Sequence, residues 1–405
     1  MVKRIYDKVL SWHFTEYRQM AFLAGPRQVG KTTILNKYLE SRAYSNYLNW
    51  DNIEHREQIL KGYQAYLNKL PIEAQLLEKP IIGFDEIHKY RNWRNYLKGF
   101  FDTYNTKLDI VVTGSARLHI QRRGGDSMMG RYFPYNIHPL SIAELIGIEL
   151  PNMINPLKEQ KKIGTDVLDA LLVFGGFPES FTKQSVVFHR KWSSLRQEQL
   201  IRGDIIEIAD IQEINQLELL TSFLKHDAGN IINYSNIAKH IRVSEPTVKR
   251  WLELLKSFYY CFTIKPWSQN ITRSLIKNPK LFLWDWSVIE DRGAKIENMV
   301  AVHLLKAIDL WTDMGIDNYS LHFIRDKDQR EVDFLVVKNN NPWLLVEVKA
   351  SFKESLSKKL IYFNNMLKPD HALQVAYDLP FVDIDCFSGK EPVIVSLETF
   401  LSQLV

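Results

Sequence analysis

The stretch MAFLAGPRQVGKTTILNKYL, residues 20–39, decides the fold of the first part of the chain. Its first residues are apolar and predict a strand, a glycine-rich turn follows, and apolar residues then recur with a helical period. Gly25 to Thr32 match the pattern G-x-x-x-x-G-K-[ST] in the strand–loop–helix context that this motif requires. Glycines let successive backbone N–H groups turn inward around phosphate oxygens, and the start of the helix adds its positive dipole end. The stretch therefore predicts a phosphate-binding loop.

The side chains at the end of this loop predict a nucleotide site with a metal ion. We expect Lys31 to reach the β- and γ-phosphates and the Thr32 hydroxyl to ligate Mg²⁺. The predicted nucleotide-binding residues of the loop are Gly25, Pro26, Arg27, Gln28, Val29, Gly30, Lys31, Thr32 and Thr33.

A second apolar strand, PIIGFDEIHKY (80–90), ends in two adjacent acids. Asp85 at the end of a strand beside the loop can hold the Mg²⁺ shell. Glu86 is placed to orient or deprotonate a water molecule that attacks the γ-phosphate. The pair favours hydrolysis of the nucleotide over binding alone.

A third strand, LDIVVTGSARL (108–118), ends in small hydroxyl residues. We expect Ser115 to lie between Asp85 and the γ-phosphate, although a plain β-turn explains the residue equally well. The basic, glycine-rich stretch 121–140 follows. Arg131 is the candidate for a finger that acts across a subunit boundary in a homo-oligomer. Its rivals are Arg117, Arg122 and Arg123, and each of these arginines is also compatible with a solvated loop charge.

The stretch 235–267 has the pattern of a winged helix-turn-helix. Ser244 is an N-cap candidate for the second helix. The apolar stripe of that helix is formed by Val248, Trp251, Leu252 and Leu255. An aromatic strand then follows in the place of a wing. The second helix could enter a major groove, and residues 225–275 hold eight Lys or Arg against three Asp or Glu. Winged helices also serve as connectors or protein-binding modules, so this alternative stays open.

The stretch EVDFLVVKNNNPWLLVEVKAS (331–351) predicts a hairpin with a charged end. Side chains alternate along a strand, so Glu347 and Lys349 share one side, and the hairpin can bring Asp333 close to Glu347. Two carboxylates can hold a divalent cation, and the lysine can steady a water molecule or a developing charge. The alternative is an ordinary exposed ion pair.

Several segments together resemble the AAA+-type prokaryotic ATPases that carry a C-terminal DUF4143 domain. The segments in the first part are GPRQVGKTT, YLNWD (47–51), IIGFDEIHKYRNW, VVTGSARL and GRYFPYNIHPLSIAEL. Those in the second part are GGFPES (175–180), RGDI (202–205), KLFLWDWSV (280–288), IENMVAVHLL (296–305), REVDFLVV and LLVEVKAS. The resemblance implies a P-loop core with an extra strand between the loop strand and the Asp-Glu strand. It also implies ATP, rather than GTP, as the nucleotide.

The Asp, spacer, Glu-x-Lys arrangement of the hairpin resembles the PD-(D/E)xK nuclease superfamily. Glu297, on an expected helix, resembles the additional acid of several such nucleases. The resemblance implies a divalent cation on Glu297, Asp333 and Glu347, with Glu347 and Lys349 as catalytic residues. Val332 departs from the pattern, because the superfamily has proline there. Whether the site cleaves stays open.

The whole chain, of 405 residues, is 45% hydrophobic and 24% charged, as in soluble globular proteins. Cys261 and Cys386 are its only cysteines, and no run approaches the ~18 apolar residues of a membrane span. We therefore expect a cytoplasmic protein without a membrane partner.

The predicted fold is α/β, with a P-loop NTPase core of the AAA+ (ASCE) type, a helical and winged-helix region and a restriction-endonuclease-like α/β domain. The predicted domains are an ATPase domain at 1–150, a helical connector or lid at 151–215, a winged helix-turn-helix at 216–270 and a nuclease-like domain at 271–405, with the DUF4143 region at about 200–360.

The functional hypothesis is a Mg²⁺-dependent ATPase that couples ATP hydrolysis to an action on DNA through the winged-helix and nuclease-like modules. The alternative is an ATP-dependent switch or scaffold whose nuclease-like fold binds a partner and cleaves nothing. A remodelling ATPase that acts on proteins is a third option, without a substrate-threading motif to support it.

Overall fold

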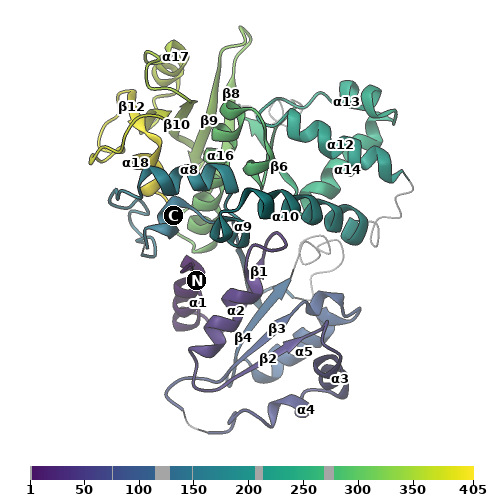
Figure 1. The fold of residues 1–405 in the computed structure, drawn as a ribbon. Coiled ribbons are helices and arrows are strands. Elements are labelled where there is room, and N and C mark those ends of the chain that lie inside the picture. The colour runs from purple at the N-terminus through teal and green to yellow at the C-terminus, as the bar shows by residue number, and fades with distance from the viewer. Residues whose placement is uncertain (1, 75, 115–127, 148, 206–212, 269–277) are drawn as a thin grey trace. The chain divides into compact units, whose positions relative to one another are not determined.

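The computed structural model divides the chain into two units, Met1–His138 and Pro139–Val405 (Figure 1). It describes residues 2–74, 76–114, 128–147, 149–205, 213–268 and 278–405. Among the helices of these ranges, none combines the length and the apolar character that crossing a bilayer requires.

The first unit is built on a parallel five-stranded sheet of order β2-β3-β4-β1-β5. Its strands are β1 (Met20–Ala24), β2 (Ser45–Asn49), β3 (Ile81–Asp85), β4 (Asp109–Gly114) and β5 (Tyr132–Asn136). β1, β3 and β4 are wholly buried and almost entirely apolar, as strands of a parallel sheet covered on both faces must be. β4 lies between the loop strand β1 and the Asp-Glu strand β3, so the predicted extra strand is confirmed.

Helices cover both faces of this sheet. They are α1 (Ile5–Glu16), α2 (Lys31–Glu40), α3 (Ile53–Lys61), α4 (Gln64–Leu67), the 3-10 turn η1 (Ile87–Lys89) and α5 (Trp93–Tyr104). On one face, α5 buries an aromatic stripe in a cluster that includes Phe22, Phe84 and Val112. On the other face, α2 lies so close to β3 that a Cβ atom at Gly83 would come within 2.8 Å of Leu35. Glycine at position 83 thus allows α2, which begins at the loop, to pack tightly on the strand that carries Asp85.

The second unit contains a mixed seven-stranded sheet of order β12-β11-β10-β9-β8-β6-β7. Its strands are β6 (Cys261–Pro266), β7 (Lys280–Leu283), β8 (Tyr319–Arg325), β9 (Glu331–Lys338), β10 (Asn341–Lys349), β11 (His371–Ala376) and β12 (Val393–Ser396). β9 and β10 form the predicted antiparallel hairpin. Asn339 and Asn340, both with positive φ, make its turn, because asparagine tolerates the left-handed region better than most residues.

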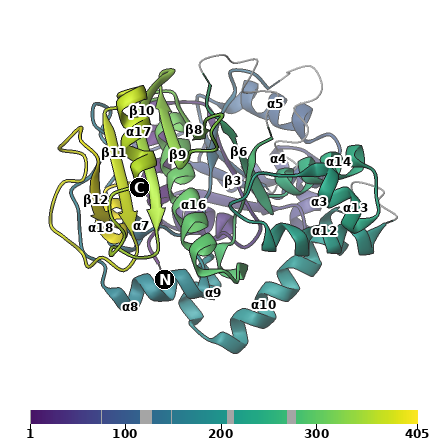
Figure 2. The ribbon, with the colours of Figure 1, turned by 90° about the horizontal axis from the view of Figure 1, so that it is seen from above.

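The helices of the second unit precede and flank this sheet. They are α7 (Ile142–Leu145), α8 (Thr165–Phe174), α9 (Pro178–Lys183), α10 (Val186–Glu198), the π-helical η2 (Gln199–Ile205), α12 (Ile214–His226), α13 (Tyr234–Ile241), α14 (Glu245–Ser257), the 3-10 turn η3 (Trp286–Val288), α16 (Arg292–Asp313), α17 (Lys358–Leu367) and α18 (Leu397–Ser402). Figure 2 shows α16 and α17 beside the strands of the hairpin, and both helices contact β10. The hairpin is therefore embedded between helices.

Helices α13 and α14 and the strand β6 correspond to the stretch 235–267, which has the helix-turn-helix pattern. The Ser244 hydroxyl accepts a hydrogen bond from the Thr247 N–H at 3.2 Å, which caps α14 as expected. The four residues of the expected apolar stripe of α14 are buried. The strand β6 differs from a free wing, however. It pairs with β7 on one side and with β8 on the other, so it is an interior strand of the large sheet.

Candidate functional site

The loop between β1 and α2 has a backbone that only certain residues can adopt. Gly30 has a φ of 99° and Gln28 a φ of 62°, both in the left-handed region. A Cβ atom on Gly25 would lie 2.4 Å from the carbonyl oxygen of Ile137, which no side chain can tolerate. The two motif glycines are thus required by close approach at one position and by backbone conformation at the other.

Lys31 lies across this loop. Its side chain is only 7% exposed, and its Nζ donates hydrogen bonds to the carbonyl oxygens of Gly25 and Pro26, both at 2.8 Å. The ammonium group is therefore held at the rim of the turn whose N–H groups are expected to bind phosphate. Charged phosphate oxygens are stronger acceptors than these carbonyls, so Lys31 can exchange one set of partners for the other.

Asp85, at the end of β3, contacts side chains from β2, from β4 and from the start of α2. Its Oδ2 accepts hydrogen bonds from Thr32 Oγ1 at 2.8 Å and from the Tyr47 hydroxyl at 2.7 Å. Its Oδ1 accepts a hydrogen bond from the Thr113 hydroxyl. The carboxylate is 2% exposed, and its hydrogen bonds orient it toward the loop. A hydroxyl and a carboxylate oxygen side by side are hard donors of the kind that Mg²⁺ takes, so Thr32 and Asp85 fit the metal that the loop motif implies.

Glu86 follows Asp85 in an unusual conformation. Its φ of 55° places a side-chain-bearing residue in the left-handed region, a conformation that carries a cost and recurs at active sites. Its Oε2 lies 3.5 Å from His88 Nε2 and 3.7 Å from Lys89 Nζ. Burial raises the pKa of the Glu86 carboxyl above its usual value, although the charge of Lys31 opposes this shift. A raised pKa makes the carboxylate a better base.

The other residues predicted for the nucleotide site have different outcomes. Ser115, Arg117, Arg122 and Arg123 lie outside the described residues. Arg131 binds both carboxylate oxygens of Asp102 on α5, at 2.8 and 3.0 Å. This ion pair must open before Arg131 can act across a subunit boundary.

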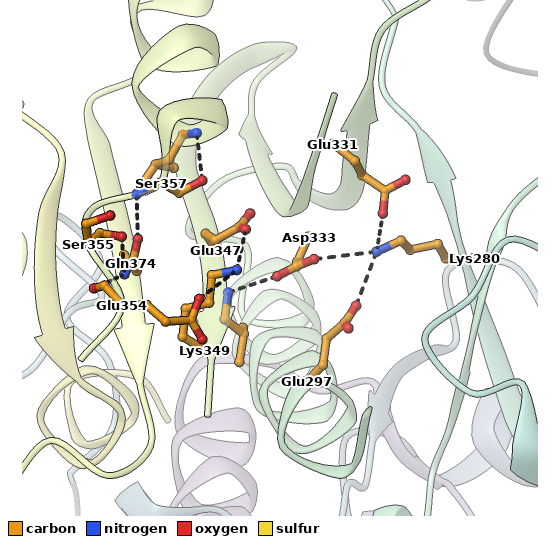
Figure 3. A network of polar contacts seen from close by, with 12 residues as sticks. Lys280, Glu297, Glu331, Asp333, Glu347, Lys349, Glu354, Ser355, Ser357 and Gln374 are labelled. Carbon is orange, nitrogen blue, oxygen red and sulfur yellow. Dashed lines mark hydrogen bonds and ion pairs between the residues drawn. The ribbon is translucent and has the colours of Figure 1, made fainter. Parts of the chain in front are cut away.

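A second cluster of charges lies at one end of the hairpin (Figure 3). Lys280, at the start of β7, is surrounded by three carboxylates. Its Nζ lies 2.8 Å from Glu331 Oε1, 3.2 Å from Glu297 Oε1 and 3.6 Å from Asp333 Oδ1. Burial disfavours the ammonium form, but Glu297, Asp333 and Glu331 outweigh it and raise the pKa of Lys280 above its usual value.

The other two members of the predicted second site, Glu347 and Lys349, lie on β10, which pairs with the strand of Asp333. Asp333 Oδ2 accepts a hydrogen bond from the Val348 N–H at 2.8 Å. Lys349 Nζ lies 3.2 Å from Glu347 Oε1 and 3.5 Å from Glu354 Oε2 (Figure 3). Glu347 Oε2 is buried without a hydrogen-bond partner among the described residues. Burial, and then the charge of Asp333, raise the pKa of Glu347 to about 7.

Three family models match consecutive parts of the chain. A model described as AAA domain matches residues 17–146, and the domain of unknown function DUF8612 matches residues 165–291. The domain of unknown function DUF4143 matches residues 292–380. The chain thus carries an AAA domain and a DUF4143 domain.

Relatives that match most of the chain share little more than a fifth of its residues. A protein of Haemophilus influenzae, described as uncharacterized, is 23% identical over 361 residues, which cover 82% of this chain and 87% of that protein. An uncharacterized protein of Methanocaldococcus jannaschii is 22% identical over 389 residues, which cover 86% of this chain and 79% of that protein. Among solved structures, the Walker-type ATPase of Pyrococcus abyssi is 17% identical, with a TM-score of 0.46, over 73% of this chain and 96% of that chain.

Within the AAA domain, the structure adds Tyr47, which donates to Asp85 from the edge strand β2. Thr113, a small hydroxyl residue at the end of the third predicted strand, donates to Asp85 from β4. Parallel pairing explains both contacts. Thr113 is the direct partner of Asp85 on β4. Tyr47 lies two residues before Asn49, the direct partner of Asp85 on β2, and side chains two residues apart on a strand share one face. Knowledge of the strand order would have identified both neighbours, and the sequence alone does not supply it.

At the DUF4143 domain, the structure joins Glu297 and Asp333 through Lys280, a residue outside the predicted set. The signal was present in the sequence, since a lysine begins a strand, KLFL, that is otherwise wholly apolar. Within the described ranges, no three His, Cys, Asp or Glu side chains are arranged so that they could hold a metal ion together. Glu297 points its Oε1 at an ammonium group, so it does not fit the predicted role of metal ligand in this arrangement.

Proposed function

We propose that this AAA-domain chain is a Mg²⁺-dependent ATPase that couples ATP hydrolysis to an action on DNA. The observation that carries the first part is the contact of Thr32 Oγ1 with Asp85 Oδ2 at 2.8 Å, beside a loop spanned by Lys31. These are groups that nucleotide hydrolysis by a P-loop protein uses, and their contact supports the proposal.

Each residue of the nucleotide site has a role that follows from its position. The amides of the loop and the Lys31 ammonium group bind the phosphates and keep them in line for attack. Thr32 and Asp85 are the residues that would hold Mg²⁺, which neutralises charge on the phosphate oxygens when bound. Tyr47 and Thr113 fix the orientation of the Asp85 carboxylate. Glu86 accepts a proton from the attacking water molecule.

The second part of the proposal, contact with DNA, is supported by the surface of α13 and α14. These two helices and the turn between them expose five basic side chains to solvent. The five are Lys239, His240, Arg242, Lys249 and Arg250. One of them, Lys249, is paired with Glu245 at 2.7 Å, a surface contact that phosphate can replace at little cost. Duplex phosphates attract such a surface regardless of base sequence.

We expect DNA to increase the rate of ATP hydrolysis, and reversal of charge on α14 to weaken this effect. The double variant Lys249→Glu/Arg250→Glu should bind duplex DNA more weakly and lower the salt dependence of binding by about two phosphate contacts. Phosphate release with increasing DNA, measured at two salt concentrations, tests this. The matched control is Lys161→Glu/Lys162→Glu, a pair of exposed lysines away from these helices. No stimulation by DNA or RNA at low salt, with basal hydrolysis intact, would refute this part of the proposal.

A second candidate function is favoured by the ion pairs of Lys280. With Glu297 and Asp333 engaged by an ammonium group, the DUF4143 domain could bind a partner protein and cleave nothing. The chain would then be an ATP-dependent switch or scaffold, in which Arg131 acts when subunits meet. Incubation of plasmid DNA with Mg²⁺ or Mn²⁺ separates the two candidates. Cleavage that disappears in Glu347→Ala supports nuclease action, whereas intact plasmid under every metal and nucleotide supports the switch.

A further inference from the structure

Lys280, at the start of β7, is a buried charged group of the second unit. Lys280 is 3% exposed, and the other three residues of its strand are buried and apolar. A buried ammonium group is expensive unless it is paired, so the chain must supply it with counter-charges. Three carboxylates from two different elements, α16 and β9, do so.

We propose that the Lys280 ammonium group is the built-in cation of this cluster and occupies the place that a divalent cation would otherwise take among Glu297, Glu331 and Asp333. The inference goes beyond the proposed function, because it concerns which cation the cluster holds and not what the domain acts on. Figure 3 shows Glu297, Glu331 and Asp333 around Nζ, each from a different backbone position.

The remaining oxygen atoms cannot complete a metal site while Lys280 is in place. Asp333 Oδ2 is engaged by the Val348 N–H, and Glu347 Oε1 by Lys349. Glu347 Oε2 remains, buried and without a hydrogen-bond partner among the described residues. These contacts, together with the positive charge of the Lys280 ammonium group itself, oppose the entry of a second cation.

Removal of the ammonium group should therefore convert the cluster into a metal site. Lys280→Met keeps the length and apolar character of the stem but leaves Glu297 and Asp333 without the Lys280 cation, while Glu331 keeps its contact with Arg325 at 3.3 Å. Divalent cations can then enter, because carboxylate oxygens are the ligands that they prefer. A second variant, Lys280→Met/Glu331→Gln, removes one positive and one negative charge, so the net charge of its cluster equals that of the unmodified chain. It separates the loss of the internal cation from a simple gain of negative charge.

The test is Mn²⁺ binding in the absence of nucleotide. Binding is measured by calorimetry and by the shift of the unfolding temperature. All variants are made in an Asp85→Asn chain, so that the AAA domain does not contribute its own metal ligand. We expect Lys280→Met and the charge-matched variant to bind Mn²⁺ about tenfold or more tightly than the Asp85→Asn chain. Added Glu297→Gln should remove this gain. Lys280→Arg, which keeps the positive charge, and Lys265→Met, an exposed lysine on β6, should leave binding unchanged.

Three results would overturn the proposal. One is equal Mn²⁺ affinity in the Asp85→Asn chain and in the folded charge-matched variant. Another is tight Mn²⁺ binding by the Asp85→Asn chain that Glu297→Gln abolishes. If the methionine variants unfold in EDTA, refolding on addition of Mn²⁺ supports the proposal, and failure to refold contradicts it. None of these readouts depends on ATP hydrolysis or DNA, so they stand apart from the proposed function.

Discussion

Replacing Lys31 with alanine is expected to weaken ATP binding about 10- to 100-fold, the range of a lost charge-assisted contact. Phosphate release should fall further, by about two to three orders of magnitude, because the ammonium group also stabilises charge that develops in the transition state. Both effects follow from the position of Nζ at the rim of the loop, 2.8 Å from two of its carbonyl oxygens.

The matched control for this variant is Lys37→Ala. Lys37 lies on the same helix, α2, but is half-exposed and pairs with Asp7 at the surface. Its loss should leave ATP affinity and phosphate release close to those of the unmodified chain, since exposed ion pairs contribute little. Equal behaviour of the two alanine variants in equilibrium binding and in phosphate release would show that the loop does not hold the nucleotide as we describe.

Replacing Glu86 with glutamine is expected to separate binding from hydrolysis. The amide keeps the shape of the side chain but cannot accept a proton, so the rate should fall about 10²- to 10⁴-fold, the usual contribution of a general base. ATP affinity should be retained or slightly increased, because a negative charge close to the phosphates is lost. Burial raises the pKa of Glu86, which suits it to this role.

Single-turnover hydrolysis and ATP binding measured on the same preparation test this prediction. Glu40→Gln, an exposed acid at the end of α2, is the control and should behave like the unmodified chain. A fall in ATP affinity that matches the fall in rate would assign Glu86 to binding and would leave the general base unidentified.

The loop and its acidic partner could be predicted from the sequence because local signals specify them. Gly25 and Gly30 match a motif, and Asp85 ends a continuous apolar strand. The structure brings Thr32 and Asp85 into contact although 53 positions separate them in the sequence. Residues whose role depends on the order of strands were not foreseen, Tyr47 among them, because the order of parallel strands is not encoded in any one segment.

In the second unit, sequence patterns predicted local elements but not the contacts between distant segments. Alternation and the asparagine turn were sufficient to predict the β9–β10 hairpin and to place Glu347 and Lys349 on one side of it, where they form an ion pair. The pattern of β6 indicated a strand after α14, but its pairing with β8 depends on a partner more than fifty residues away. The ion pairs of Lys280 could not be predicted from the sequence for the same reason. Its partners Glu297, Glu331 and Asp333 come from elements that meet only in the folded sheet.

The most direct test of the central claim is phosphate release from ATP by the unmodified chain in Mg²⁺ and in excess EDTA. We predict multiple turnovers with Mg²⁺ and essentially none in EDTA, because Thr32 and Asp85, which contact each other, would hold the ion that the reaction needs. Absence of phosphate release with Mg²⁺, or an equal rate in EDTA, would contradict the assignment of the loop and its acidic pair as an ATPase site.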